Sequence, residues 1–191
     1  MARSVDAALR GRGIDETTRH RVGEALALGM EPRLAALDDD HHPALLHPGR
    51  SLLVLLHDVE SLDEPSLLLA ALHESADAAL RVPPQRVRDR LGPALVDRLA
   101  ALPLPGHEAL AERLVLLDRA SALAVLAEHL DQLRHLHLRP ETGAEWSETL
   151  EEVERAWGPF ASRIDERLSV RYAHWSRTFA RRLRRGQFPR V

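Results

Sequence analysis

Leucine and alanine recur at intervals of three to four positions along most of the chain, with charged residues between them. This is the spacing of amphipathic helices, because residues three and four apart share one helix face. No segment alternates apolar and polar residues for long enough to predict a strand. The pattern therefore predicts an all-α fold of about seven to nine helices.

Proline, glycine and acidic capping residues divide this pattern into separate helices. The first helix is predicted from Asp15 or Thr17 to Gly29, and the segment LDDDHHPALLHPG after it is predicted to be a loop. The remaining predicted helices run from about Arg50 to Ser61, from Pro65 onward, in two short pieces around Gly92 and Pro93, from Leu110 to Leu138 with room for one break, through AEWSETLEEVERAW, and from Pro159 to Arg185.

Length and composition indicate one globular domain over residues 1–191. Hydrophobic residues make up 45% of the chain and charged residues 29%, which is typical of a folded protein. No apolar run reaches the roughly 20 residues of a membrane span, and the first segment lacks the apolar core of a signal peptide. We therefore expect a cytoplasmic protein that does not engage membranes. A net charge of -3 gives no reason to expect nucleic acid as a partner.

The absence of cysteine excludes disulfides and thiolate metal sites, but leaves histidine and carboxylate sites open. All 26 basic residues are arginine, so no lysine can act in catalysis. The chain has 11 histidines, and three of them, His41, His42 and His47, lie in the predicted loop. A metal site can form where such a loop histidine faces a neighbouring His-acid pair. Two such pairs follow the loop, His57-Asp58 and His73-Glu74.

Several stretches resemble a known family when they are taken in order. They are HPGRSLLVLL, SLLLAALHESADAAL, VRDRLGPALVDRLAAL and LAVLAEHLDQLRHLHLRPETGAEWSE. Together they resemble the HD-domain hydrolases of the RelA/SpoT type, including the small alarmone hydrolases. The resemblance covers about residues 45–160 and implies the HD-domain helical fold. Residues 161–191 are expected to add a C-terminal helix and a basic tail.

The family's spacing distinguishes between the two His-acid pairs. If His73-Glu74 is the motif pair, His47 lies 26 residues before it and Gly92 lies 19 residues after His73, as the resemblance requires. The separations from His57-Asp58 do not match the pattern. The resemblance therefore assigns the motif to His73-Glu74, although His57-Asp58 is the literal His-Asp pair.

The resemblance implies three sets of functional residues. They are the metal ligands His47, His73, Glu74 and Glu128, the catalytic residues Glu74 and Asp77, and the substrate-binding residues Gln132 and Arg50. Asp118 in LVLLDRASAL is a competing choice for the last metal ligand. Without the resemblance, Glu128 and Asp131 would be interpreted as acids on a helix surface.

The chemistry implied by the family is hydrolysis at phosphorus. A divalent metal, manganese or alternatively iron, acidifies a bound water and polarises the phosphoryl oxygen. A nearby carboxylate takes or steers the proton. The expected substrate is a small nucleotide pyrophosphate, guanosine tetra- or pentaphosphate, which loses its 3'-pyrophosphate. A homo-oligomer is left open.

This sequence departs from the family pattern at several of these positions. Glu74 and Glu128 replace aspartates, and each adds a methylene, roughly 1.5 Å, to a distance that metal ligands hold to about ±0.2 Å. The family's acidic pair becomes Asp77-Ala78, and Arg33 with acids replaces its basic glycine loop. One alternative is therefore a catalytically degenerate HD-fold protein that binds a nucleotide or a protein partner without turnover. Another is an HD-type oxygenase with two irons, which would need His41, His42 and His57 as further ligands.

Overall fold

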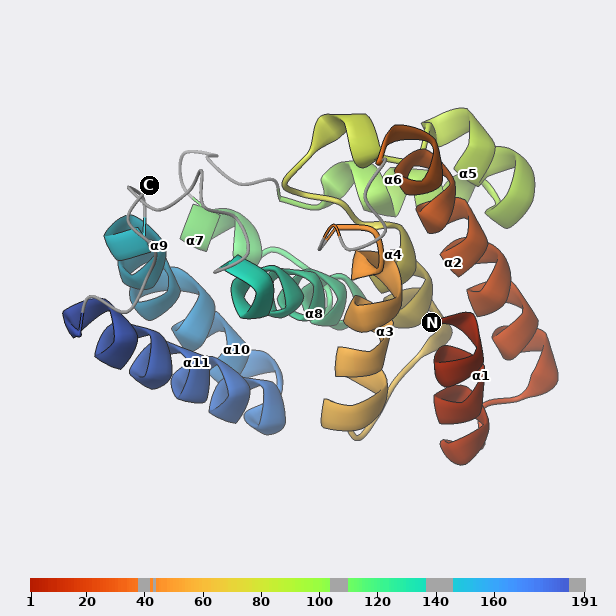
Figure 1. Ribbon diagram of the computed structural model, residues 1–191. Coiled ribbons are helices and arrows are strands. Elements are labelled where there is room, and N and C mark those ends of the chain that lie inside the picture. The colour runs from red at the N-terminus through yellow and green to blue at the C-terminus, as the bar shows by residue number, and fades with distance from the viewer. Residues whose placement is uncertain (38–41, 43, 104–109, 137–145, 186–191) are drawn as a thin grey trace.

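A computed structural model of the protein describes residues 1–37, 42, 44–103, 110–136 and 146–185 (Figure 1). This part of the chain is helical and contains no β-strand, which confirms the predicted all-α fold. The elements are α1 (Ala2–Gly11), α2 (Glu16–Ala36), α3 (His47–Asp58), α4 (Glu64–Leu72), the 3-10 turn η1 (Ala78–Leu80), α5 (Pro84–Leu91), α6 (Pro93–Ala101), α7 (Leu110–Leu114), α8 (Arg119–His135), α9 (Trp146–Glu152), the π-helical turn η4 (Val153–Trp157), α10 (Gly158–Ile164) and α11 (Glu166–Arg184).

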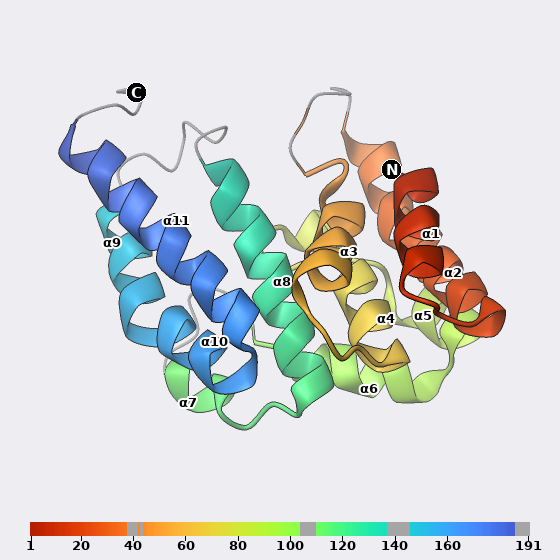
Figure 2. The same ribbon diagram turned by 90° about the horizontal axis from the view of Figure 1, so that it is seen from below.

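Helix α8 lies at the centre of the molecule (Figure 2). It packs against α3 and α4 on one side and against α10 and α11 on the other, while α1 and α2 cover α3 and α4 from outside. Every α8 residue from Ala120 to Asp131 is buried. The segment SALAVLA of α8 consists mostly of small and apolar residues, so neighbouring helices can pack closely against several of its faces. Because α8 is surrounded in this way, its few polar side chains also lie in the interior of the protein.

Aspartate side chains fix the start of several helices. The N-cap residues Asp15, Asp63, Asp118 and Asp165 begin α2, α4, α8 and α11, and each carboxylate accepts a backbone N–H of the first helical turn. Such a cap satisfies a donor that has no partner inside the helix. The predicted helix from Leu110 to Leu138 is broken once, between α7 and α8, as the sequence allowed, and Asp118 marks the new start. The prediction of one helix from Pro159 to Arg185 is wrong, because Asp165 ends α10 and caps α11 as a separate helix.

The predicted end of the first long helix at Gly29 is wrong. Helix α2 continues through Pro32 to Ala36, and Gly29 packs instead against α4. A Cβ atom at this position would overlap the carbonyl oxygen of Ala71, so the glycine permits close approach of two helices. The helix α1 was not predicted at all.

The predicted loop over residues 37–49 agrees only in part. Its positions 38–41 and 43, including His41, lie outside the described residues, as do residues 137–138 of the predicted long helix and residues 186–191 of the basic tail RRLRRGQFPRV. Helix α3 begins at His47 rather than at Arg50, with Pro48 in its first turn where no amide hydrogen is needed. His47 is thus the first residue of a helix rather than part of a loop. Across the described residues, no helix combines the length and apolar character needed to cross a membrane.

Candidate functional site

His47 stands at the first turn of α3 and is held from one side by α8. Its Nδ1 lies 2.7 Å from Oδ2 of Asp131. Arg50, one turn further along α3, holds the same carboxylate through hydrogen bonds from Nε to Oδ1 at 2.9 Å and to Oδ2 at 3.1 Å, and from Nη2 to Oδ2 at 3.0 Å. The opposite ring nitrogen, Nε2 of His47, is buried and has no hydrogen-bond partner among the described residues. It lies 3.5 Å from Oε1 of Glu128.

Glu128 is the second buried acid of this cluster. Its Oε1 accepts hydrogen bonds from the backbone N–H of Ser75 at 3.1 Å, from the Ser75 hydroxyl at 2.7 Å, and from the amide of Gln132. Glu128, Asp131 and Gln132 share one face of α8 because they are three and four residues apart. This face points at α3 and at the segment after α4.

His73 follows the last residue of α4, is buried, and is near enough to Glu128 and His47 for their charges to act on it. Burial lowers its pKa and outweighs the opposing charges of Glu128 and Glu74, so His73 is neutral at pH 7. A neutral imidazole can offer a ring nitrogen as a metal ligand.

His47 and Glu128 carry opposite charges in this structure. Burial disfavours the charged form of His47, but its contacts with Asp131 and Glu128 outweigh burial and raise its pKa to about 9. Burial would also raise the pKa of Glu128, yet its contact with the positively charged His47 brings that pKa to about 2. The cluster therefore holds negative carboxylates around one imidazolium.

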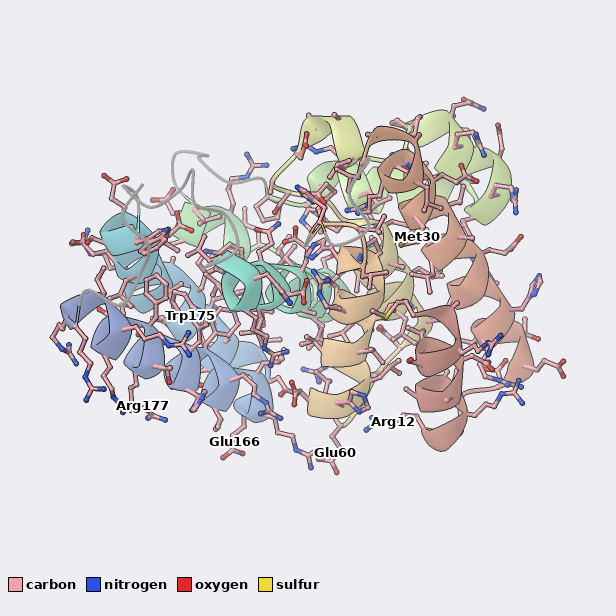
Figure 3. All side chains as sticks on the ribbon, viewed as in Figure 1. Arg12, Met30, Glu60, Glu166, Trp175 and Arg177 are labelled. Atoms are coloured by element: carbon pink, nitrogen blue, oxygen red, sulfur yellow. The ribbon has the colours of Figure 1, made fainter. Side chains whose placement is uncertain are left out.

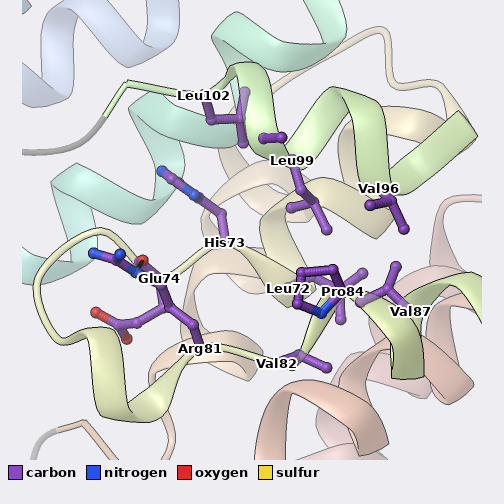
Figure 4. Close-up of a pocket in the computed structure, with 11 residues that line it drawn as sticks. Leu72, His73, Glu74, Arg81, Val82, Pro84, Val87, Val96, Leu99 and Leu102 are labelled. Atoms are coloured by element: carbon purple, nitrogen blue, oxygen red, sulfur yellow. Dashed lines mark hydrogen bonds between the residues drawn. The ribbon is translucent and has the colours of Figure 1, made fainter.

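Glu74 is turned away from this cluster. Figure 4 shows the His73 imidazole and the Glu74 carboxylate leaving the chain in different directions. Oε2 of Glu74 forms an ion pair with Arg33, and Oε1 accepts the backbone N–H groups of Ala76 at 2.9 Å and Asp77 at 3.0 Å. Arg33 therefore already balances the negative charge of the Glu74 carboxylate, and both of its oxygens have hydrogen-bond partners inside the protein.

Arg33 is fully buried, with 0% of its surface exposed. Among the described residues, its guanidinium donates to Glu74 and to the backbone carbonyls of Ala44 at 3.0 Å, Gly29 at 2.5 Å and Leu80 at 3.2 Å. A buried arginine needs such a complete set of acceptors, because an unpaired charge in the interior is strongly destabilising. Arg33 thereby fastens α2 to the segment that carries the His73-Glu74 pair.

The other candidate residues take more peripheral positions. Asp77 is exposed and caps η1 by accepting the N–H of Ala79 at 2.8 Å. Asp118 stands at the N-cap of α8, ten residues and about 15 Å along the helix from Glu128. His57 is exposed, whereas Asp58 is buried and bound by Arg171 on α11. His42 accepts the N–H of Ala44 at 3.1 Å.

Of the four expected metal ligands, His47 and Glu128 lie side by side, and His73 is buried near enough to interact with the charge of Glu128. The fourth, Glu74, is paired with Arg33. Within the described ranges, no group of three or more His, Asp or Glu side chains is arranged as a ready metal site. The donor chemistry of His47 nevertheless fits a cation. A metal-binding histidine usually has a carboxylate on its other ring nitrogen, as Asp131 is here, and gives up the proton on the nitrogen that faces the ion.

Three residues of this region were not predicted to act there: Arg33, Ser75 and Asp131. The interpretation of Glu128 and Asp131 as surface acids is wrong, since they are only 1% and 2% exposed. Helical spacing on α8 was the available signal for Asp131, which lies three residues after Glu128. The position of Ser75 beside Glu74 gave no signal by itself.

A scan against models of protein families found no match for this chain, and searches of curated proteins and of solved structures found none either.

Proposed function

We propose that the protein is a metal-dependent phosphohydrolase of the HD type that acts on a nucleotide pyrophosphate. Guanosine tetra- or pentaphosphate is the leading substrate, on the sequence resemblance alone. The observation that carries the proposal is the state of His47. Its Nδ1 is held by Asp131 while its buried Nε2 lacks a hydrogen-bond partner among the described residues and faces Glu128.

In this proposal His47, His73 and Glu128 hold one divalent cation, manganese or iron. Such an ion lowers the pKa of a bound water and polarises a phosphoryl oxygen. Asp131 orients the His47 ring, and Ser75 with Gln132 orients the Glu128 carboxylate. These contacts position the ligands in the way that supporting hydrogen bonds do in metalloenzymes.

The remaining residues of the site, Arg50, Asp77 and Glu74, are assigned different roles. Arg50 keeps about a fifth of its side chain exposed while it is paired to Asp131, so it offers positive charge at the edge of the site. Asp77 is exposed on the segment after His73 and Glu74, where a carboxylate can accept the proton of an attacking water. Glu74 serves this segment structurally, through Arg33 and two backbone N–H groups.

Metal binding tests the proposal most directly. We expect the purified chain, stripped with a chelator and then dialysed against manganese, to retain about one ion per chain by elemental analysis. His47→Ala and Glu128→Gln should each reduce this occupancy at least tenfold. His57→Ala is the matched control, because His57 also lies on α3 but is exposed, and it should leave occupancy unchanged.

Turnover is tested with guanosine tetraphosphate and chromatographic detection of GDP. We expect His73→Ala to abolish product formation and His57→Ala to preserve it. A chain that binds no manganese under these conditions would rule out the enzyme proposal.

A second candidate, a protein that binds a nucleotide or partner without turnover, is favoured by the Arg33-Glu74 contact. The guanidinium already supplies a positive charge to a carboxylate that the family directs at its metal. If this candidate is correct, nucleotide binding persists in chelator and no GDP forms at any manganese concentration.

A further inference from the structure

A pocket of about 440 Å³ lies between the C-terminal part of α8 and one face of α11, separate from the His47 cluster. It is lined by Leu133, Arg134, Arg171, His174, Trp175, Thr178, Phe179 and Arg182. Its volume is in the range of sites that hold small molecules. The question is which chemistry its walls would accept.

The lining is strongly basic. It contains the three guanidiniums of Arg134, Arg171 and Arg182, and no carboxylate among the residues that line it. Asp58 contacts Arg171 at 2.6 Å and Arg134 at 3.6 Å, but one carboxylate balances only one of these charges. The side chain of Arg182 forms no hydrogen bond or ion pair with any residue that the structure describes. The pocket therefore has excess positive charge.

The pocket-lining residues of α11 lie on one face of that helix because of their spacing in the sequence. Arg171, Trp175, Thr178 and Arg182 are separated by four, three and four residues, which places them along a single helix face. Figure 3 shows Trp175 on the side of α11 toward α8, and Arg177 extending from the other side. A single row of basic, aromatic and hydroxyl side chains thus faces the end of α8.

The wall of the pocket is held in place. The indole N–H of Trp175 donates to the carbonyl oxygen of Leu133 at 2.9 Å, and its ring stacks on Phe179 with the ring centroids 4.5 Å apart. Asp58 fixes Arg171 through both Nε and Nη2. Preorganised guanidiniums lose less entropy when they bind an anion, and their planar fork matches phosphate oxygens.

We propose that this pocket binds a phosphorylated small molecule through Arg134, Arg171 and Arg182. The site differs from the candidate metal site in its residues and needs no metal ion. The proposal does not depend on the proposed function, since it concerns binding on the opposite side of α8.

Isothermal titration calorimetry of the full chain in chelator tests this site, with inorganic pyrophosphate and ATP as probes. We expect both to bind, with affinity that weakens as salt is added. Arg182→Gln should weaken binding about tenfold, the value of one charge-assisted hydrogen bond. Because Arg182 is exposed, this variant should fold normally, which thermal melting would verify.

Arg177→Gln is the matched control. It removes the same charge from the same helix, but its side chain is outside the pocket lining. Binding by Arg177→Gln and by His73→Ala should equal that of the unsubstituted chain. This outcome separates the pocket from the candidate metal site, so a failure of the hydrolysis test leaves it unaffected.

Three results would overturn the proposal. One is no heat of binding for either probe up to millimolar concentrations. Another is binding that His73→Ala abolishes and Arg182→Gln leaves intact, because the anion would then occupy the candidate metal site. The last is a single-stranded oligonucleotide that binds far more tightly than ATP and loses affinity equally with Arg177→Gln and Arg182→Gln, which would indicate an extended nucleic-acid surface.

Discussion

Two buried histidines of neighbouring helices differ in charge because their neighbours differ. His47 has two carboxylates beside it, and its pKa is raised to about 9. His129 lies against the ring of Trp157, with centroids 3.9 Å apart, and burial lowers its pKa to about 4. Its Nδ1 is 3.1 Å from the Tyr172 hydroxyl, which itself donates to the carbonyl of Leu126. Because the only hydroxyl hydrogen of Tyr172 is donated to Leu126, Nδ1 of His129 must donate to the hydroxyl oxygen. The low pKa of His129 means that the ring is neutral at pH 7.

This difference predicts a pH dependence of stability. The unfolded chain protonates His129 near pH 6.5, whereas the folded chain does so only near pH 4. The unfolded state thus binds more protons between these values, and the free energy of unfolding should fall by up to about 3 kcal/mol as pH drops from 6.5 to 4. His129→Phe removes this contribution, so its stability should fall less steeply in urea titrations across that range. His73, whose pKa is also lowered, accounts for part of the slope that remains. Parallel slopes for the two chains would contradict the prediction.

At the scale of elements, the packing of α2 on α4 depends on a glycine that sequence alone suggests is a helix end. Gly29 lies directly over the backbone of Ala71, while Gly23, on the same helix, has nothing within 4 Å of where a Cβ would be. Both glycines lie inside α2. Only the position of α4 distinguishes their roles.

Alanine substitution should therefore act in opposite directions at these two sites. Gly29→Ala should destabilise the fold by about 2 kcal/mol or more, because the methyl group forces α2 away from α4. Gly23→Ala should stabilise it by up to about 1 kcal/mol, since alanine favours the helix and meets no neighbour. Chemical unfolding curves of the two variants measure both effects. Equal destabilisation by both would mean that α4 does not lie where the structure places it.

Helix content was predictable from the sequence because the apolar spacing and the aspartate caps are local signals. The contact between His47 and Asp131 could not be predicted from local signals, because the two residues are 84 positions apart and meet only when α8 packs against α3. The place of Glu128 beside His47 depends on the same packing. The family resemblance supplied His47, His73 and Glu128 as candidates. It did not indicate that Glu74 would be paired with Arg33, because that contact requires α2 to extend past Gly29 as far as Arg33.

At the scale of the whole molecule, Asp58 links the two halves of the chain. It is buried at the end of α3, and Arg171, 113 residues later on α11, binds it with two hydrogen bonds. The literal His-Asp pair of the sequence thus contributes its aspartate to a long-range ion pair, while its histidine is exposed. Arg134 on α8 approaches the same carboxylate, so three helices meet at this residue.

Removing this link should loosen α11 from the rest of the molecule. We expect Asp58→Ala to lower the free energy of unfolding by about 2 kcal/mol, because it leaves two guanidiniums without their shared partner. Glu60→Gln is the control, since the Glu60–Arg167 ion pair is 3.8 Å long and its side chains are 84% and 58% exposed. It should change stability by less than about 0.5 kcal/mol. Urea denaturation compares them, and equal effects would contradict the role assigned to Asp58.

The central position of α8 also has a consequence for synthesis on the ribosome. Helices α3 and α4 leave the exit tunnel before α8 and can cover one of its sides at once, whereas α10 and α11 emerge after it. Until they do, the nascent chain exposes the opposite apolar side of α8, including the strip that later packs against Phe160 and Tyr172. Such a surface invites chaperone binding or aggregation. The His47 cluster is therefore expected to assemble first, and the basic pocket between α8 and α11 only after α11 has emerged.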